Sequence, residues 1–313
     1  MKKRNIAILG ATSHIAKGLI NNFLKEDEFI LHLFSRSSDK PRDFLSTISK
    51  TPNEDCVVYG GYGDFLKGSY DVVINCVGVG TANKLQGDFS KYFTVTEEYD
   101  NLVINYLLHG HSDALYVSFS SGVVYGGNFS APGEENTVNN ISVNHVVPED
   151  YYSIVRINAE AKHRSFKNLK IADLRLFSYF SRFIDLADGY FITEVMDCIL
   201  KKKTLITNDV NFVRDYVHPE DLFAMVKKCM AVGNINQAFD VTSAKTVEKK
   251  EILDYFSQEY NLKYKTDQSL NPASATGQKK IYCSNYFNAA DIGYKPAFSS
   301  LDTIKQESKY ILI

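Results

Sequence analysis

Residues 150 to 160, DYYSIVRINAE, carry a tyrosine and an arginine at a spacing that suits proton transfer. Tyr152 and Arg156 are four residues apart, so on a helix they lie one above the other on the same face. A positive charge at that distance favours the ionised form of a phenol, which lets the phenol give and take a proton. An arginine keeps its charge, although it cannot release a proton of its own. We therefore interpret the two residues as a candidate acid/base pair whose cation does not titrate.

A second candidate site lies near the N-terminus, in the stretch GATSHIAKG. Gly10 ends an apolar run and precedes a helical pattern, so it supplies a tight turn between a strand and a helix. In such a turn the first N–H groups of the helix can bind the diphosphate of a dinucleotide. Ser13 and Ala16 stand where glycines usually allow this close approach, and both are small. The predicted cofactor contacts are Gly10, Thr12, Ser13, His14 and Ile15.

The end of the second predicted strand, LFSRSSDK, indicates which dinucleotide is bound. An acidic residue there would accept the adenosine ribose hydroxyls, whereas an arginine beside hydroxyl groups would bind a 2′-phosphate. Arg36 stands between Ser35 and Ser37, and the first carboxylate after it is Asp39. We predict that Ser35, Arg36 and Ser37 bind NADP(H), with NAD(H) as the alternative cofactor.

A parallel sheet would bring these groups together. Apolar runs typical of strands alternate with helical patterns in the first half of the chain, namely NIAILG, FILHLFS, CVVYG, YDVVINCVG, ALYVSFSS and KIADLRLF. Between the first two runs, HIAKGLINNFLKED has apolar residues at helical spacing. Near-continuous apolar strands that alternate with helices indicate a parallel sheet covered on both faces. The expected fold class is α/β, a Rossmann-like doubly wound parallel sheet with a smaller, mostly C-terminal substrate lobe.

The pattern loosens after residue 180, where helical and strand-like segments follow each other irregularly. We expect a dinucleotide-binding Rossmann domain over residues 1–174, with segments that return to it near residues 208–244. Residues 175–313 are expected to form mainly a substrate-binding lobe.

Charge and composition argue against several kinds of partner. The 313 residues carry a net charge of -2, and the pI is near 6.4, so no broad cationic field would attract nucleic acid or a membrane surface. No apolar stretch reaches the length of about 18 residues that a membrane span needs, and His14 and Lys17 interrupt the apolar N-terminal segment, which argues against a signal peptide. The five cysteines form no CxxC pair, which favours reduced thiols, a cytoplasmic location and no metal site.

Three further motifs follow the glycine turn in order. Residues 120–126 read SSGVVYG, residues 152–160 read YSIVRINAE, and residues 214–221 read RDYVHPED. Together with the glycine turn, they resemble the extended short-chain dehydrogenase/reductases of the NAD-dependent epimerase/dehydratase type. The resemblance covers nearly the whole chain, and Arg156, at the position of the family's lysine, is the departure from its pattern.

The resemblance implies roles at the reacting centre. Ser121 would be the catalytic serine and Tyr152 the acid/base, with Arg156 in place of the lysine beside the nicotinamide ribose. Arg214 would contact the diphosphate of a nucleotide substrate. Ser178 would stand in for an asparagine that is common near the substrate base.

The resemblance also implies contacts along the cofactor. Gly78 matches the turn after the fourth strand of the family. Asp64 resembles the acidic residue near the adenine, and Asn101 resembles the helix asparagine that organises the site.

These features predict an oxidoreductase, namely a cytoplasmic NADPH-dependent reductase of a 4-keto sugar attached to a nucleoside diphosphate. One alternative is an NAD-dependent nucleotide-sugar epimerase, which an acidic residue at the end of the second strand would have favoured. Another is a non-catalytic NADP(H)-binding or sensing protein, in which Ser13, Ala16 and Arg156 are the result of drift. The expected partner is a nucleotide sugar, neither nucleic acid nor membrane is expected, and a homodimer is compatible with the sequence.

Overall fold

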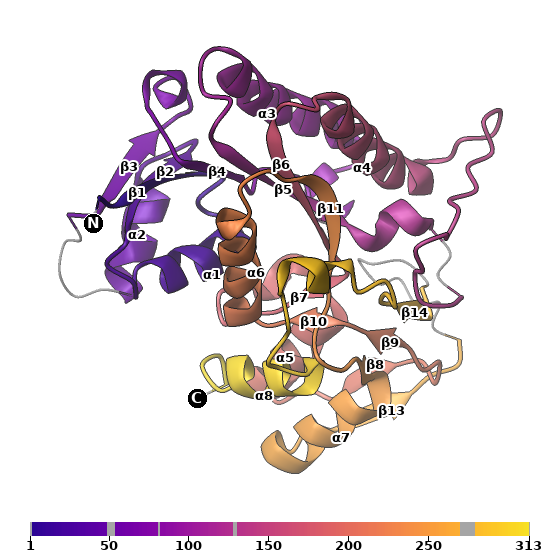
Figure 1. The fold of residues 1–313 in the computed structure, drawn as a ribbon. Helices are drawn as coiled ribbons and strands as arrows, with labels where there is room; N and C mark the ends of the chain where they lie inside the picture. The colour runs from indigo at the N-terminus through magenta and orange to yellow at the C-terminus, as the bar shows by residue number, and fades with distance from the viewer. Residues whose placement is uncertain (1, 49–53, 81, 128–129, 270–278, 313) are drawn as a thin grey trace.

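A seven-stranded parallel sheet forms the main body of the protein (Figure 1). The computed structural model describes residues 2–48, 54–80, 82–127, 130–269 and 279–312. The sheet has the strand order β11-β6-β5-β4-β1-β2-β3. Its strands are β1 (Arg4–Leu9), β2 (Phe29–Ser35), β3 (Cys56–Gly60), β4 (Val72–Asn75), β5 (Leu115–Ser121), β6 (Lys170–Leu176) and β11 (Asn236–Val241). The predicted Rossmann-like doubly wound fold is confirmed.

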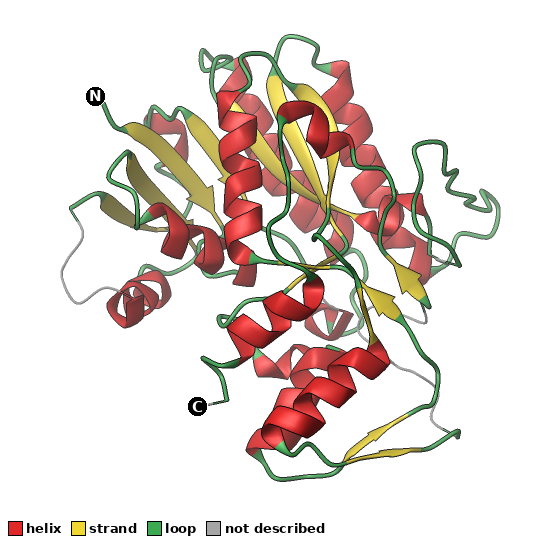
Figure 2. Cartoon of the chain, turned by 60° about the horizontal axis from the view of Figure 1, so that its bottom comes forward, coloured by secondary structure: helices red, strands yellow, loops and turns green. Residues whose placement is uncertain are grey.

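Helices cover both faces of this sheet (Figure 2). Ile6 and Ile8 pack on one face with α1, whereas Ala7 and Leu9 pack on the other face with α3. Successive side chains of a strand point to opposite faces, so a sheet buried on both faces needs apolar residues at nearly every position. The helices of the first face are α1 (His14–Phe23), α2 (Asp39–Ile48) and α6 (Pro219–Ala231), and those of the second are α3 (Lys91–Leu108) and α4 (Pro148–Ser165).

The smaller lobe has its own apolar core, in which Ile192 and Met196 pack with Phe256 and Ile304. Its helices are α5 (Phe191–Leu200), α7 (Lys249–Tyr260) and α8 (Ser300–Ser308). Short strands form small sheets of the orders β10-β7, β12-β9-β14 and β13-β8. They are β7 (Ser178–Tyr179), β8 (Leu205–Thr207), β9 (Val213–Arg214), β10 (Tyr216–Val217), β12 (Val247–Glu248), β13 (Tyr264–Thr266) and β14 (Ile281–Tyr282). Single 3-10 turns are η1 (Phe65–Lys67), η2 (Ala82–Leu85), η3 (Gly122–Tyr125), η4 (Leu186–Asp188) and η5 (Asn288–Ile292).

The chain passes more than once between the sheet and the lobe. Strand β11 joins the main sheet beside β6, and α6 packs against α1, where the Asn22 amide donates a hydrogen bond to the Pro219 carbonyl at 3.1 Å. Both elements fall within the segment 208–244 that we expected to return to the Rossmann domain. In the same segment, β9 and β10 belong to the small sheets of the lobe. No helix among the described residues is both long and apolar enough to span a membrane.

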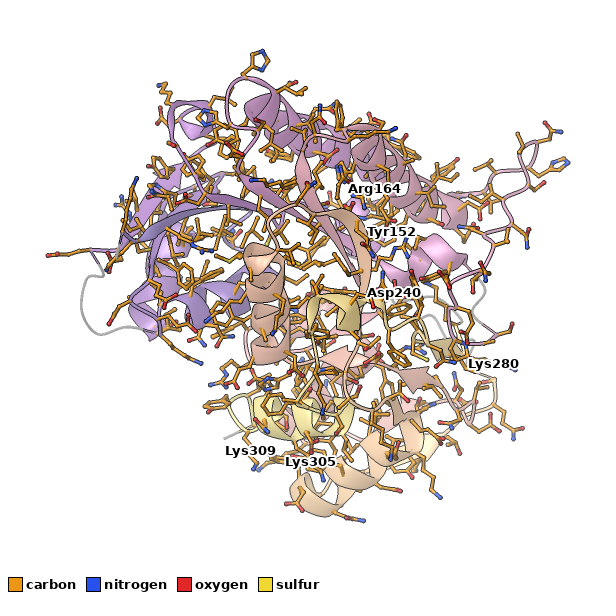
Figure 3. All side chains as sticks on the ribbon, in the orientation of Figure 1. Tyr152, Arg164, Asp240, Lys280, Lys305 and Lys309 are labelled. Atoms are coloured by element: carbon orange, nitrogen blue, oxygen red, sulfur yellow. The ribbon has the colours of Figure 1, made fainter. Side chains whose placement is uncertain are left out.

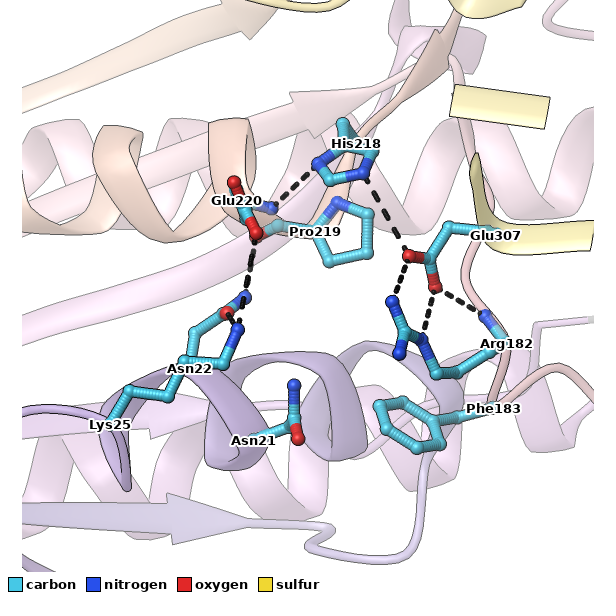
Figure 4. Close-up of a pocket in the computed structure, with 9 residues that line it drawn as sticks. All are labelled: Asn21, Asn22, Lys25, Arg182, Phe183, His218, Pro219, Glu220 and Glu307. Carbon is cyan, nitrogen blue, oxygen red and sulfur yellow. Dashed lines mark hydrogen bonds and ion pairs between the residues drawn. The ribbon is translucent and has the colours of Figure 1, made fainter. Parts of the chain in front are cut away.

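A buried carboxylate of the lobe lies against the N-terminus of α6 (Figure 4). Glu307 of α8 is 2% exposed and accepts hydrogen bonds from the backbone N–H of Arg182 at 2.7 Å and from its guanidinium at 2.6 and 3.0 Å. His218, the N-cap residue of α6, has its Nε2 3.8 Å from the same carboxylate. The last helix of the chain is therefore tied to a helix that covers the main sheet.

Candidate active site

The turn between β1 and α1 has the geometry that the sequence predicted. Gly10 has a φ of +73°, and a Cβ atom there would lie 2.9 Å from the backbone of Cys76 and Val77, so a side chain would clash. Ser13 caps α1, because its Oγ accepts a hydrogen bond from the Ala16 N–H at 3.2 Å. The first turn of α1 carries no acidic residue, so the N-terminus of the helix keeps its favourable potential for an anion.

His14 differs from the other residues of this turn, because its side chain faces the lobe. Its Nε2 accepts a hydrogen bond from the Ser181 N–H at 3.1 Å, and its ring lies 4.8 Å from the Tyr179 ring. Burial lowers the pKa of His14 to about 3, so the imidazole is neutral and acts as an acceptor. The backbone of His14, rather than its side chain, is therefore what remains available to a ligand at the N-terminus of α1. Thr12 and Ile15 lie half-buried beside it.

At the end of β2 the two predicted hydroxyl groups bind within their own loop. The Ser35 hydroxyl is buried and donates to the Ser37 carbonyl at 2.5 Å, and the Ser37 Oγ accepts from the Asp39 N–H at 3.2 Å. Arg36 is exposed and lies near Tyr62 and Tyr99; burial raises the pKa of both phenols, and the Arg36 charge offsets part of this rise. Of this trio, only the Arg36 side chain is directed outward, where it could reach a ligand.

Tyr152 lies in the N-terminal half of α4, on the side toward the smaller lobe (Figure 3), and Arg156 follows it one helical turn later. The Tyr152 ring packs against the small apolar cluster that contains Val123 and Phe177. The guanidinium carbon of Arg156 lies 5.0 Å from the centroid of this ring, and its Nη1 donates to the Phe119 carbonyl of β5 at 2.8 Å. The helical spacing thus places the cation beside the phenol, as predicted.

Arg156 also reaches the turn that follows β4. A Cβ atom added to Gly78 would lie 3.3 Å from the Arg156 Nη2, so the glycine leaves room for the guanidinium. The Arg156 Nε is buried and has no hydrogen-bond partner among the described residues. A buried donor without a partner is costly, so this N–H suits an acceptor on a ligand in the crevice. The glycine turn, the N-terminus of α1 and this guanidinium together fit a dinucleotide.

Ser121 is the last residue of β5 and the N-cap residue of η3. Its hydroxyl is hydrogen-bonded to the Tyr282 hydroxyl at 2.7 Å, and Tyr282 belongs to the same apolar cluster against which Tyr152 packs. The structure therefore brings Ser121 and Tyr152 to one region, at the carboxyl end of the central strands. In open α/β sheets this is the edge where ligands bind.

The two predicted substrate contacts lie on short strands of the lobe. Arg214 of β9 is 5% exposed, and its guanidinium lies 4.4 Å from the Phe212 ring and donates to the Val213 carbonyl at 2.9 Å. Burial lowers the pKa of Arg214 from its ordinary value. Ser178 of β7 is half-buried, and its backbone pairs with Tyr216 of β10.

Two other residues predicted to contact the cofactor have side chains at the surface. The Asp64 carboxylate is exposed and forms an ion pair with Lys67 at 2.7 Å. The Asn101 side chain is exposed and accepts a hydrogen bond from the Lys162 ammonium of α4 at 2.9 Å. Successive residues of a helix differ by about 100° in direction, so the inward position beside Asn101 is taken by the buried Asp100. The sequence motif alone did not define this helix register.

The sequence also missed several tyrosines at the site. The Tyr92 ring lies 5.1 Å from the Tyr152 ring, and the Tyr190 hydroxyl donates to the Gly80 carbonyl at 3.2 Å. Tyr62, in the loop after β3, lies beside the Gly10 backbone, and its ring is 4.6 Å from the Tyr99 ring. These residues belong to no motif, and their contacts depend on how the lobe and the loops after β3 and β4 fold against the sheet.

Three other residues of the predicted motifs, Ser120, Tyr125 and Glu160, belong to a buried polar network. The Glu160 carboxylate accepts hydrogen bonds from the Ser120 hydroxyl at 2.5 Å and from the Arg175 guanidinium at 2.6 Å. Tyr125 donates to Asp240 of β11 at 2.8 Å. The network joins β5, α4, β6 and β11, so these motif residues hold the site in place.

Comparisons with known proteins agree with this architecture. The chain is similar to a variant of UDP-glucuronic acid 4-epimerase from Bacillus cereus, solved with a fluorinated UDP-glucuronic acid and NAD, at 17% identity and a TM-score of 0.81, over 98% of each chain. It is also similar to UDP-N-acetylglucosamine 4-epimerase from Methanobrevibacter ruminantium M1, at 17% identity and a TM-score of 0.81, over 100% of this chain and 99% of the other. The protein RMD from Pseudomonas aeruginosa, solved with NADPH, matches at 17% identity and a TM-score of 0.72, over 99% and 96% of the two chains.

At these identities the likeness establishes the fold. A search of curated protein sequences finds no match. A family model, described as the NAD dependent epimerase/dehydratase family, matches residues 6–241, which include the glycine turn, Ser121, Tyr152 and Arg156. Because this match covers more than half of the chain, the protein belongs to the NAD dependent epimerase/dehydratase family.

Proposed function

We propose that this protein is a nicotinamide-dependent 4-epimerase of nucleotide-diphosphate sugars. The observation that carries the proposal is the meeting of Ser121, Tyr152 and Arg156 at the same edge of the sheet as the Gly10 turn. The sequence led us to expect an NADPH-dependent 4-keto reductase. The comparisons support the epimerase alternative better, since two of the three relatives described above are 4-epimerases.

The residues that would hold the cofactor come from three elements. The backbone at Gly10 and the N-terminus of α1, capped by Ser13, would bind the diphosphate. Arg156 would hold the nicotinamide ribose through its N–H groups, and Gly78 leaves the space for this contact. When bound, the nicotinamide supplies an acceptor and then a donor of hydride.

Tyr152 and Ser121 would act on the C4 oxygen of the sugar. Tyr152 would act as the general base that takes the proton of the C4 hydroxyl while the C4–H bond breaks and its hydride leaves, so C4 becomes a carbonyl. Ser121 donates a hydrogen bond to the carbonyl oxygen and stabilises the charge that develops on it. After the keto sugar has turned, hydride adds to its other face and Tyr152 returns the proton to oxygen, which inverts the configuration at C4.

Arg214 would bind the substrate diphosphate. A guanidinium presents a planar pair of donors that matches phosphate oxygens, and this one is held by the Phe212 ring and the Val213 carbonyl. Burial lowers the local dielectric, so an anion there gains more from the charge than it would at the surface.

The direct test is incubation of the purified protein with UDP-glucuronic acid, UDP-N-acetylglucosamine and UDP-glucose, followed by proton NMR of the sugar. We expect an equilibrium mixture of the two C4 configurations of at least one substrate, without net consumption of cofactor. The cofactor that co-purifies with the protein identifies the dinucleotide by mass. If none of these sugars is inverted at C4, the epimerase proposal fails.

The second candidate is the 4-keto reductase, and Arg36 is the observation that favours it. Arg36 is exposed at the end of β2, where a 2′-phosphate would lie, and no acidic residue occupies the position. Stoichiometric oxidation of NADPH by a 4-keto nucleotide sugar, without inversion of the corresponding 4-hydroxy sugars, would favour this candidate.

A further inference from the structure

The hydroxyl of Ser121 has a partner that no motif predicts. Tyr282 comes from β14 in the lobe, far from Ser121 in the sequence, and its hydroxyl lies 2.7 Å from the Ser121 Oγ. Both side chains are buried, with exposed fractions of 8% for Ser121 and 3% for Tyr282. A short contact between two buried hydroxyl groups uses the proton of one of them and a lone pair of the other.

Either hydroxyl can be the donor in this pair, and the arrangement with Tyr282 as donor leaves the Ser121 proton for another acceptor. The Val123 N–H donates to the Ser121 Oγ at 3.5 Å. Burial raises the pKa of Tyr282, so this phenol keeps its proton and can donate it to Ser121. The oxygen of Ser121 is then an acceptor, and its own proton is directed elsewhere.

We propose that Tyr282 is a positioning residue. It does not contact the substrate itself, and it orients the Ser121 hydroxyl toward the oxygen of the reacting sugar carbon. This inference rests on the proposed function, because it assigns Ser121 to that oxygen. Tyr282 fixes the hydroxyl rotor before the substrate binds, so less reorganisation is needed when charge develops on the oxygen.

The strand that carries Tyr282 also links it to the substrate lobe. Strand β14 pairs in parallel with β9, and Tyr282 is the register partner of Arg214. A substrate diphosphate bound at Arg214 would therefore hold β9 and β14 together, and with them the phenol that contacts Ser121. Occupation of the lobe and orientation of the serine are coupled through one small sheet.

The phenol can be tested without disturbing its packing. The Tyr282 ring lies 5.3 Å from the Phe177 ring and 4.1 Å from the Lys279 ammonium nitrogen. Phenylalanine preserves these ring contacts and removes only the hydroxyl. We expect Tyr282→Phe to lower kcat for C4 inversion by about tenfold or more, with little change in KM or in cofactor affinity.

A double-mutant cycle separates positioning from a purely structural role. In the Ser121→Ala background, Tyr282→Phe should change kcat by less than about twofold, because the hydroxyl that it orients is already absent. Tyr294→Phe is the matched control, since it removes another buried phenol hydroxyl, which donates to the Thr242 carbonyl at 2.9 Å away from the site. The control should leave kcat within about twofold of the native value. An unchanged kcat in Tyr282→Phe, or losses that multiply in the double variant, would overturn the proposal.

A fluorine resonance gives a readout that does not need turnover. With 3-fluorotyrosine at position 282, we expect the ¹⁹F signal to shift in Ser121→Ala and on addition of UDP to the native serine form. Absence of either shift would contradict the proposed contact or its coupling to the lobe. If the native protein inverts no sugar while both shifts occur, the proposed function fails and the Tyr282 link to Ser121 and the lobe stands.

Discussion

Arg156 can take the place of a lysine at this site because its surroundings suit a guanidinium. Its Nη1 binds the Phe119 carbonyl at 2.8 Å, its Nη2 faces Gly78, and its carbon lies 5.0 Å from the Tyr152 ring. A planar group with several donors can hold the main chain and a ribose at once, whereas a lysine ammonium acts as one point charge. Hydride transfer needs the charge and the contact, and neither requires the cation to titrate.

Arg156→Lys should therefore retain measurable activity, with kcat lowered by about tenfold, or roughly 1.4 kcal/mol of transition-state stabilisation. Arg156→Ala should lose activity and also weaken cofactor binding, because the charge and the ribose contact disappear together. Steady-state kinetics and a cofactor titration measure the two effects.

Tyr152→Phe is the companion variant, since it removes the proton acceptor alone and should abolish turnover while the cofactor still binds. Turnover of Tyr152→Phe at the native rate would remove Tyr152 from the reaction.

Arg36 should set the relative affinity for the two dinucleotides. It is exposed, and it is the member of its trio whose side chain is directed outward, since the Ser35 and Ser37 hydroxyls bind within the loop. Arg36→Ala should weaken NADPH binding by about tenfold to a hundredfold and leave NADH nearly unchanged, because one charge-assisted contact to a phosphate is lost. Arg42→Ala, which removes an exposed arginine of α2, is the control. Equal losses for NADPH and NADH in Arg36→Ala would show that Arg36 does not bind the 2′-phosphate.

At the scale of elements, a buried histidine joins α3, α4 and the sheet. His163 of α4 is fully buried, and its two ring nitrogens lie 2.8 Å from carboxylates of Asp100 on α3 and Asp173 on β6. These carboxylates raise the pKa of His163 to about 9 against the effect of burial, so the imidazolium is the folded form at neutral pH. The two carboxylates also face other groups. The Tyr116 hydroxyl of β5 and the Lys162 ammonium contact Asp100, and the Arg164 guanidinium contacts Asp173.

This network predicts a loss of stability on the alkaline side. The folded-state pKa of His163 is above its unfolded value near 6.5, so its contribution is complete below pH 6.5 and disappears as the pH rises through about 9. The loss should be on the order of 3 kcal/mol of the free energy of unfolding. Urea unfolding of the native protein and of His163→Gln between pH 6 and 10 measures it. Glutamine does not titrate, so the variant should lack this part of the slope, and identical slopes would contradict the assignment.

Across the whole molecule, local sequence patterns predicted the strands of the parallel sheet, because each strand is a short apolar run of its own. The runs that we interpreted as strands became β1 to β6, because a parallel sheet buried on both faces requires apolar runs. The glycine turn and the Tyr152–Arg156 pair were also predictable, because each depends on residues that are only a few positions apart in the sequence. The contact between Ser121 and Tyr282 joins residues from opposite parts of the chain, so no spacing in the sequence reveals it.

The last prediction concerns the junction between the lobe and the sheet. Glu307 is the buried acceptor for Arg182 (Figure 4). The Arg182 guanidinium also lies 3.2 Å from the centre of the Tyr310 ring. Glu307→Gln removes the charge and leaves the guanidinium without its counterion. Breaking such a pair from one side costs more than the pair itself contributes, so we expect a loss of about 2 to 4 kcal/mol in the free energy of unfolding.

Denaturant unfolding of Glu307→Gln, followed by tyrosine fluorescence and far-UV circular dichroism, tests this prediction in a chain that has 20 tyrosines and no tryptophan. The matched control is Glu259→Gln, which makes the same change at an exposed position of α7 and should cost less than about 0.5 kcal/mol. Both probes should shift together in Glu307→Gln, because Asp221 of α6, which covers the main sheet, accepts hydrogen bonds from the Ala297 and Phe298 N–H groups just before α8. If only one probe shifts, or if the two variants lose the same stability, the junction does not couple the lobe to the sheet, and each would unfold on its own.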